Sequence, residues 1–345
     1  MLDNPVGKKF GDDWARQRQY VVLVTGASGF IGAELVKQLE AAGNRVICTS
    51  REPTGDSSPC VHLPSPDEPV SAFENILENV DHVVHLAAIH HAKQAVSAEE
   101  YYAANCLLTA KLAKAAHKKI TGKFVFASSI RAQCGSVFDG VMRESDSPQP
   151  TDDYGRTKLA AEAEIAAAMP CRNYTILRPV LVYGPAASGN LAKLMRLAAW
   201  PIPLPLKSLP GKRSLLDRGA LCAAIIHSLK EPKTDGEVFI VADKRPLTIG
   251  ELVAAMRRGM GYPPRLFSIP EGLLDLVAKL AAQTSRKQRL YRDLVASSAK
   301  LQSTGWEAID DPMQQIEKTS NLFGSPRLLD TSSINLFLLA SQLGV

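Results

Sequence analysis

Short runs of consecutive apolar residues recur along the chain, separated by longer stretches whose apolar positions have helical spacing. An apolar run without alternation is typical of a strand buried on both faces. Strands are predicted at 21–24, 44–50, 61–63, 83–88, 124–126, 174–178 and 238–241. Helices are predicted between them, the clearest at 33–42, 99–119, 154–168, 220–229, 247–260 and 270–282. Strands that alternate with helices indicate the α/β class.

The length and composition of the chain indicate two lobes. Its 345 residues are many for one hydrophobic core, and 46% of them are apolar, enough to fill two. Lys and Arg number 40 against 35 Asp and Glu, which leaves a net charge of +5. This mild surplus suits a phosphorylated small molecule and is too diffuse to indicate a nucleic-acid partner.

The sequence does not indicate a secreted, membrane-spanning or metal-binding protein. Its six cysteines are scattered without a Cys-x-x-Cys pair, so reduced thiols and a cytoplasmic location are expected. Residues 1–18 form a polar arm rather than a signal peptide, and the apolar run 334–339 is too short to cross a bilayer. His90 and His91 are adjacent, but acidic or cysteine partners do not cluster with them. No metal is therefore expected.

Three glycines, Gly26, Gly29 and Gly32, follow the first predicted strand, and a helix begins directly after them. A strand, a tight glycine turn and a helix N-terminus make a site for a pyrophosphate. The absent side chains let the backbone approach, while N–H groups and the helix dipole face the anion. Plain packing could also explain glycines in a turn, but their place between strand and helix favours dinucleotide binding.

The end of the second predicted strand, at Arg51, bears on the choice of dinucleotide. An acidic residue there would bond the ribose hydroxyls of NAD and repel a 2′-phosphate, whereas Arg51 attracts that phosphate. The alternative is a loop arginine in solvent. NADP is predicted, with NAD as the alternative.

Tyr154 and Lys158 are four residues apart on a predicted helix, so they share one face of it. A phenol with a pKa near 10 is a poor acid or base at neutral pH, and a nearby ammonium favours its ionised form. Ser129 precedes Tyr154 by 25 residues (154 − 129) and ends a predicted strand. Tyr-x-x-x-Lys alone is common by chance, but the glycine turn and this serine make a catalytic triad the better interpretation.

These features together resemble the extended short-chain dehydrogenase/reductase superfamily, in its branch of nucleotide-sugar epimerases, dehydratases and 4-ketoreductases. The resemblance covers roughly residues 19–315 and includes Thr25 before the glycines, the strand at 83–88, and Arg-Pro-x-x-x-Tyr-Gly-Pro at 178–185. One departure is the stretch 131–135, Arg-Ala-Gln-Cys-Gly, where the family usually has a tyrosine-glycine loop.

The resemblance implies a role for each site residue. Tyr154 would exchange a proton with the sugar oxygen, Lys158 would tune the phenol and hold the nicotinamide ribose, and Ser129 would orient the oxygen. Cofactor contacts would come from Gly26, Ser28, Gly29, Phe30, Ile31, Gly32, Arg51, Leu86, Ala87, Ala88, Asn105, Tyr154, Lys158 and Arg178. Substrate contacts would come from Ser129, Arg131, Asn190 and Arg213, the last two on the diphosphate.

The resemblance also implies the architecture. A Rossmann-like, doubly wound parallel sheet with helices on both faces is expected, plus a second, smaller α/β lobe. The cofactor domain would comprise 19–178 and 213–242, the substrate lobe 179–212 and 243–315, and the tails 1–18 and 316–345. A homodimer is expected.

Three functions remain open. The first is NADPH-dependent reduction of a 4-keto-6-deoxyhexose linked to UDP or dTDP, for surface polysaccharide such as O-antigen. The second is a nucleotide-sugar 4-epimerase with tightly bound NAD. The third is a non-catalytic member that senses the cofactor, which the intact triad argues against. A dehydratase is disfavoured because Ser129 is followed by Ile130 and Arg131 rather than an Asp-Glu pair.

Overall fold

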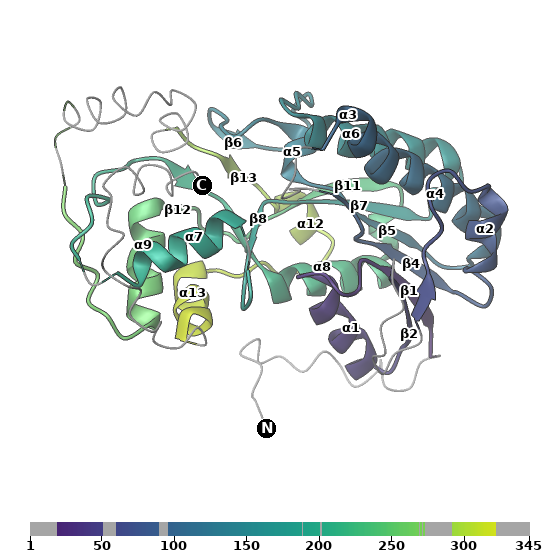
Figure 1. Cartoon of the computed structure of the whole chain (residues 1–345), viewed down its shortest axis with the longest axis horizontal. Coiled ribbons are helices and arrows are strands. Elements are labelled where there is room, and N and C mark those ends of the chain that lie inside the picture. Colours follow the sequence, from purple (N-terminus) through teal and green to yellow (C-terminus); the bar gives the residue numbers. More distant parts are fainter. Residues whose placement is uncertain are drawn as a thin grey trace. The chain divides into compact units, whose positions relative to one another are not determined.

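The computed structural model describes residues 19–50, 60–89, 96–187, 189–200, 202–268, 270, 272 and 292–321. A seven-stranded sheet has the order β11-β7-β5-β4-β1-β2-β3 (Figure 1). Its strands are β1 (Val21–Thr25), β2 (Arg45–Ser50), β3 (Cys60–His62), β4 (His82–His85), β5 (Phe124–Ala127), β7 (Tyr174–Pro179) and β11 (Glu237–Val241). Each of these lies within one or two residues of a predicted apolar run, except that β4 ends three residues before the predicted strand does.

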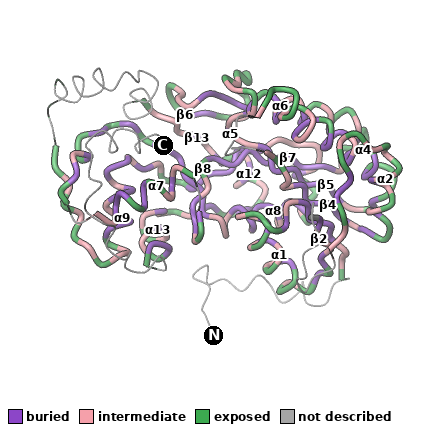
Figure 2. The backbone as a smooth tube through the Cα atoms, in the orientation of Figure 1, coloured by how far each residue is buried: buried purple, intermediate pink, exposed green. Residues whose placement is uncertain are grey.

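The order of the strands reverses beside β1. From β1 the chain passes to β2 and β3 on one side, then returns to β4 on the other side and continues outward. β1 pairs in parallel with both β2 and β4, with Leu23 opposite Ile47 and Val83. Leu23 and Val83 are fully buried, as the unbroken apolar runs require. Figure 2 shows the neighbouring strands β4 and β5 in the colour of buried residues. Loops that follow β1 and β4 therefore lie at the point where open α/β sheets bind ligands.

Helices flank the sheet on both sides, which confirms the doubly wound fold. In Figure 1, α1 (Gly32–Ala41) is drawn to the left of β1 and β2, and α2 (Val70–Asn75) and α4 (Leu108–Lys119) to the right of β4. The expected helix 99–119 is three segments: α3 (Ala98–Tyr102), the π-helix η2 (Ala103–Leu107) and α4. Further helices are α6 (Asp153–Ala168), α8 (Arg218–Lys230) and the short 3₁₀ helix η3 (Pro232–Thr234).

Two compact units can be distinguished in the chain. The first contains residues up to 127, with 161–175 and 225–236; the second contains 128–160, 176–224 and residues from 237 onward. This division differs from the expected lobes chiefly at 128–160, which carries the triad and groups with the second unit. The lobe boundaries themselves stay a prediction.

Short paired strands and three packed helices build much of the second unit. β8 (Leu181–Tyr183) pairs with β10 (Leu215–Asp217), β9 (Lys212–Arg213) with β12 (Leu247–Thr248), and β6 (Val141–Met142) with β13 (Val295–Ala296). Helix α9 (Ile249–Gly259) packs against α7 (Gly189–Ala198) and α13 (Pro312–Asn321). The remaining short helices are α5 (Ile130–Gln133) and α12 (Ala299–Gln302). The tail expected from 316 begins inside α13, where Ile316 is buried.

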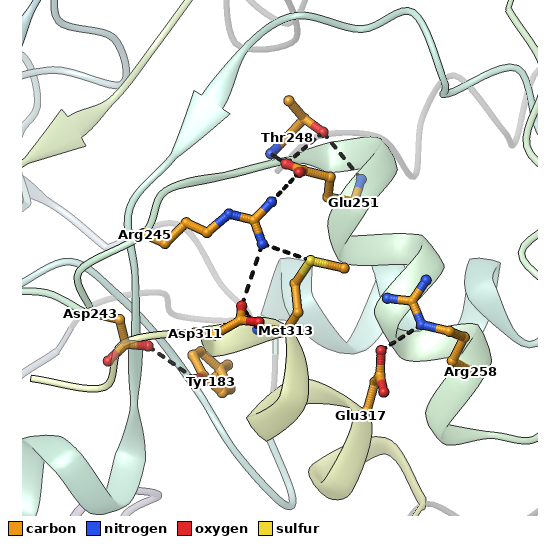
Figure 3. A network of polar contacts seen from close by, with 9 residues as sticks. All are labelled: Tyr183, Asp243, Arg245, Thr248, Glu251, Arg258, Asp311, Met313 and Glu317. Atoms are coloured by element: carbon orange, nitrogen blue, oxygen red, sulfur yellow. Dashed lines mark hydrogen bonds and ion pairs between the residues drawn. The ribbon is translucent and has the colours of Figure 1, made fainter.

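A polar network ties α9 to α13 (Figure 3). The capping box of α9, formed by Thr248 and Glu251, also receives the Arg245 guanidinium at 2.5 Å. The same guanidinium reaches Asp311 at the start of α13, at 3.4 Å. A Cβ on Gly259 would lie 2.2 Å from the Glu317 carbonyl, so the two helices approach closely at a position that only glycine allows.

Arg257 is buried on α9 without a carboxylate partner among its described contacts. Its guanidinium donates instead to the carbonyls of Ala198, Trp200, Ile202, Pro264 and Arg265. One guanidinium thus provides hydrogen bonds to carbonyl groups at the end of α7 and in two loop segments. Burial lowers the pKa of this guanidinium.

Residues 1–18, the predicted helix 270–282 (apart from residues 270 and 272) and the apolar run 334–339 lie outside the described residues. Within the described part, no helix combines the length and apolarity needed to cross a bilayer.

Candidate active site

The glycine turn after β1 has the geometry of an anion cradle. Gly26 has φ +69°, and a Cβ there would lie 2.9 Å from the Ala87 nitrogen. A Cβ on Gly32 would lie 2.2 Å from the Gly26 carbonyl, so this glycine lets α1 begin directly against the turn. The cap residue of α1, Ile31, provides no side-chain hydrogen bond to the first turn. The residues present therefore fit the pyrophosphate of a dinucleotide.

The side chain of Thr25 in β1 holds the loop after β4. Its hydroxyl oxygen accepts hydrogen bonds from the N–H groups of Leu86 and Ala87, both at 3.1 Å. It also lies 2.6 Å from Nδ1 of His85, a fully buried ring that stacks on Phe126. The predicted cofactor residues Leu86 and Ala87 thus lie directly beside the glycine turn.

A count of donors assigns the proton of His85. The two lone pairs of the Thr25 hydroxyl are occupied by N–H groups, so its own proton points to Nδ1. Nε2 lies 2.9 Å from the Thr109 hydroxyl, which donates its proton to the Asn105 carbonyl at 2.7 Å. His85 is therefore a neutral ring that carries its proton on Nε2.

Asn105 completes this support from inside the π-helix η2. Its side chain accepts from the Ile89 N–H at 2.8 Å and donates to the Ile89 carbonyl at 2.9 Å. A π turn widens the helix by one residue and is frequent at functional sites. Here the π turn contains Asn105, whose fully buried side-chain amide bonds to the loop after β4.

The three residues of the predicted triad all belong to the second unit. Ser129 follows β5 and caps α5, where its oxygen accepts from the Arg131 N–H at 3.2 Å. Tyr154 lies in the first turn of α6 and Lys158 one turn later. Lys158 is 1% exposed, whereas Tyr154 and Ser129 are half-buried. Lys158 is thus buried in the interior, whereas Tyr154 and Ser129 each keep part of their surface exposed.

One carboxylate joins the helix of Ser129 to the helix of Tyr154. Asp152 accepts from the Gly155 N–H at 2.8 Å, and its other oxygen takes both Nε and Nη2 of Arg131. Burial alone would raise the pKa of Asp152, but the bonds from Arg131 and Gly155 outweigh it and lower the pKa. A Cβ on Gly155 would lie 2.3 Å from the Arg131 carbonyl. Arg131, expected on the substrate, is therefore engaged with α6.

The other predicted ligand contacts are placed as follows. Arg178, expected at the cofactor, is buried in β7 and donates to the side chain of Gln133. Asn190 is the second residue of α7 and half-buried, and Arg213 is a buried residue of β9 opposite Leu247. Arg51, His90 and His91 lie outside the described residues. The described residues contain no group of three His, Cys, Asp or Glu side chains that could hold a metal.

Two features of the site were not predicted. Asp152 stands two residues before Tyr154 at the helix start, where an N-cap preference for aspartate could have identified it. His85 interrupts an apolar strand, a position where a polar residue needs buried partners. Its partners Thr25 and Thr109 belong to other elements and carry no local signal.

Comparison with known proteins gives consistent matches. The model of the NAD dependent epimerase/dehydratase family matches residues 22–242. UDP-glucose 4-epimerase of Vibrio cholerae is 30% identical over 311 residues, 88% of this chain and 95% of that protein. dTDP-4-dehydrorhamnose reductase of Mycolicibacterium smegmatis is 32% identical over 200 residues, 55% of each chain. The solved structure of MoeE5 in complex with UDP-glucose and NAD has a TM-score of 0.67 and 25% identity, and covers 88% of this chain and 98% of that one.

Proposed function

The chain belongs to the NAD-dependent epimerase/dehydratase family, and from this premise we propose that it reduces a 4-keto-6-deoxyhexose carried on UDP or dTDP, with NADPH. Family membership makes it an NAD(P)-dependent oxidoreductase or epimerase, so the cofactor-sensing alternative is set aside. The observation that supports the proposal is the set Ser129, Tyr154 and Lys158, in which Lys158 is buried one helical turn after a half-buried Tyr154.

Tyr154, Lys158 and Ser129 would each have a different role at the sugar oxygen. The nicotinamide supplies the hydride when bound. Tyr154 gives its phenolic proton to the oxygen that gains charge, and Lys158 stabilises the phenolate left behind. The Ser129 oxygen already accepts from Arg131, and no described residue accepts its proton. That proton is therefore available to the sugar oxygen.

The remaining contacts follow from charge and position. The glycine turn with Leu86, Ala87 and Asn105 would hold the dinucleotide. Asn190 and Arg213 would bind the diphosphate of the sugar nucleotide through charge-assisted hydrogen bonds. A cytoplasmic homodimer in surface polysaccharide synthesis is the setting we propose.

Arg51 separates reduction from the second candidate, 4-epimerisation with bound NAD. The described part of β2 extends to Ser50, and Arg51 follows Ser50 in the sequence, outside the described residues. An arginine near this strand end would attract a 2′-phosphate, which supports the choice of NADPH. Epimerisation is favoured by the full-length likeness to the Vibrio cholerae epimerase and by MoeE5, whose structure holds NAD.

The test begins with the nucleotide extracted from freshly purified protein, followed by assays with a 4-keto-6-deoxyhexose nucleotide and with UDP-glucose. A reductase would oxidise NADPH with the keto sugar, and Arg51→Asp would move its preference toward NADH at least tenfold. Copurified NAD together with conversion of UDP-glucose would establish the epimerase instead. Equal use of both cofactors before and after the substitution would refute the NADP assignment.

A further inference from the structure

The elements that carry Ser129 and Tyr154 are joined by a long connection. Ser129 caps α5, and Tyr154 follows 25 residues later in the first turn of α6. Hydride transfer with proton donation requires both hydroxyl groups at one oxygen, and misplacement by about 1 Å can cost about a hundredfold in rate. A contact near Ser129 and Tyr154 that fixes the distance between their hydroxyl groups is therefore expected.

Arg131 and Asp152 provide that contact, each two residues from a triad member. The guanidinium bonds one carboxylate oxygen through two nitrogens, a geometry that lysine cannot reproduce. The other oxygen caps α6 by accepting a hydrogen bond from the Gly155 N–H. One carboxylate therefore bonds both the start of α6 and Arg131 of α5. The contact of Gly155 with the Arg131 carbonyl brings the two backbones together at the same place.

A neighbouring ion pair shows what an ordinary surface contact looks like here. Arg156 bonds Asp153 at 2.7 Å within the first turn of α6, with side chains 55% and 50% exposed. It joins residues of one helix and cannot set the distance to another. Arg131 is 24% exposed and Asp152 42%, so the difference in burial lies mainly in the arginine, and this pair joins two elements. The two pairs thus share chemistry and differ in burial and in what they connect.

We propose that Arg131 and Asp152 are positioning residues that hold Tyr154 at the working distance from Ser129. They act through the start of α6 and do not touch the reacting atoms. The inference rests on the proposed function in one respect, that Tyr154 is the proton donor. It adds a requirement to that function: the pair must be intact for turnover, and cofactor binding does not need it.

The variants Arg131→Gln, Asp152→Ser and their combination test the coupling. Serine keeps an oxygen for the Gly155 N–H and removes the ion pair. Each single change should lower kcat about tenfold or more, with the KM of the sugar and the cofactor Kd within about twofold. The double variant should be no slower than the slower single, because both remove one contact. Arg131→Lys should restore part of the rate, and Arg156→Gln, the control, should keep it.

Opposite results would overturn the inference. Unchanged kcat in the single variants would show that the pair does not position Tyr154. A rise in the sugar KM alone would make Arg131 a direct substrate contact, and single effects that multiply in the double variant would show independent roles. Melting temperatures identify a variant that fails to fold, and Arg131→Lys then carries the test.

A substrate-free measurement separates this inference from the proposed function. Protein labelled with 3-fluorotyrosine contains eight tyrosines, and the resonance absent from Tyr154→Phe belongs to Tyr154. Arg131→Gln should shift or broaden that ¹⁹F resonance, and Arg156→Gln should leave it in place. If the wild type turns over no sugar nucleotide but the resonance moves as expected, the proposed function fails and the positioning pair stands. An unmoved resonance would refute the pair whatever the substrate.

Discussion

The carboxyl group of Asp243 makes the stability of the second unit depend on pH in an unusual direction. The group is 2% exposed and accepts a hydrogen bond from the Tyr183 hydroxyl at 3.0 Å (Figure 3). It also accepts one from the Asp217 N–H at 3.4 Å. Burial, helped by the nearby Asp217 carboxylate, raises its pKa from 3.8 to about 7 against the opposing effect of the two hydrogen bonds. We predict that Asp243→Asn stabilises the protein at pH 8 and not at pH 4.

The direction of the pH dependence follows from the protonation of Asp243 in the folded and unfolded states. Between pH 3.8 and about 7 the folded protein keeps the Asp243 proton while the unfolded chain releases it, so the stability of the wild type falls as pH rises through this range. Above pH 7 both states are ionised, and the loss is complete. At about 1.36 kcal/mol per pKa unit, the interval corresponds to at most about 4 kcal/mol. Asparagine has the same shape without the charge, so it escapes this loss.

Urea unfolding at pH 4, 6 and 8, followed by tryptophan fluorescence, measures the difference between variant and wild type. Trp200 and Trp306 belong to the second unit and report on it directly. The matched control is Asp310→Asn, which removes a carboxylate that is 83% exposed and paired with Lys244. A difference between Asp243→Asn and wild type that stays constant from pH 4 to pH 8 would refute the reasoning.

Three further predictions concern the site and the scaffold. Tyr154→Phe should lower kcat by about 10²–10⁴-fold and leave cofactor affinity, measured by nicotinamide fluorescence, nearly unchanged; a variant with half the wild-type rate would exclude Tyr154 as the acid. Arg213→Ala should raise the sugar-nucleotide KM roughly ten- to a hundredfold before kcat changes, because hydrogen bonds to charged groups contribute about 1.5–3 kcal/mol; an unchanged KM would remove Arg213 from the diphosphate site. Arg257→Met should cost at least about 3 kcal/mol of stability, because buried carbonyls lose their donor; calorimetry showing a wild-type melting temperature would contradict this.

Local patterns were sufficient to predict the central sheet. Most of its strands are apolar runs whose burial can be predicted without knowledge of their partners, although the edge strand β3 is only partly buried. The glycine turn is set by the strand and helix on either side. Two-residue strands such as β6 and β13 escaped notice because they exist only through their pairing with each other. The π turn at 103–107 is also invisible in the sequence, because its residues would serve equally well in one continuous α-helix.

The site divides in the same way. Tyr154, Lys158 and Ser129 could be singled out as a candidate triad because their spacing along the chain carries the chemistry, and their catalytic roles stay a prediction. The partner of Arg131 could not, since the choice between substrate and Asp152 depends on how α5 meets α6. Arg178 is similar: its bond to Gln133 depends on a neighbour 45 positions away.

The fixed proton of His85 gives this protein an internal spectroscopic probe. Because His85 is fully buried and its Nε2 proton is hydrogen-bonded to Thr109, we expect that proton to exchange slowly with water and its signal to differ from those of the other six histidines. Its other nitrogen is one hydroxyl away from the N–H groups of Leu86 and Ala87. A dinucleotide that binds at this loop should therefore shift one imidazole signal, and spectra of the nitrogen-15-labelled protein would then report cofactor binding without any label on the cofactor.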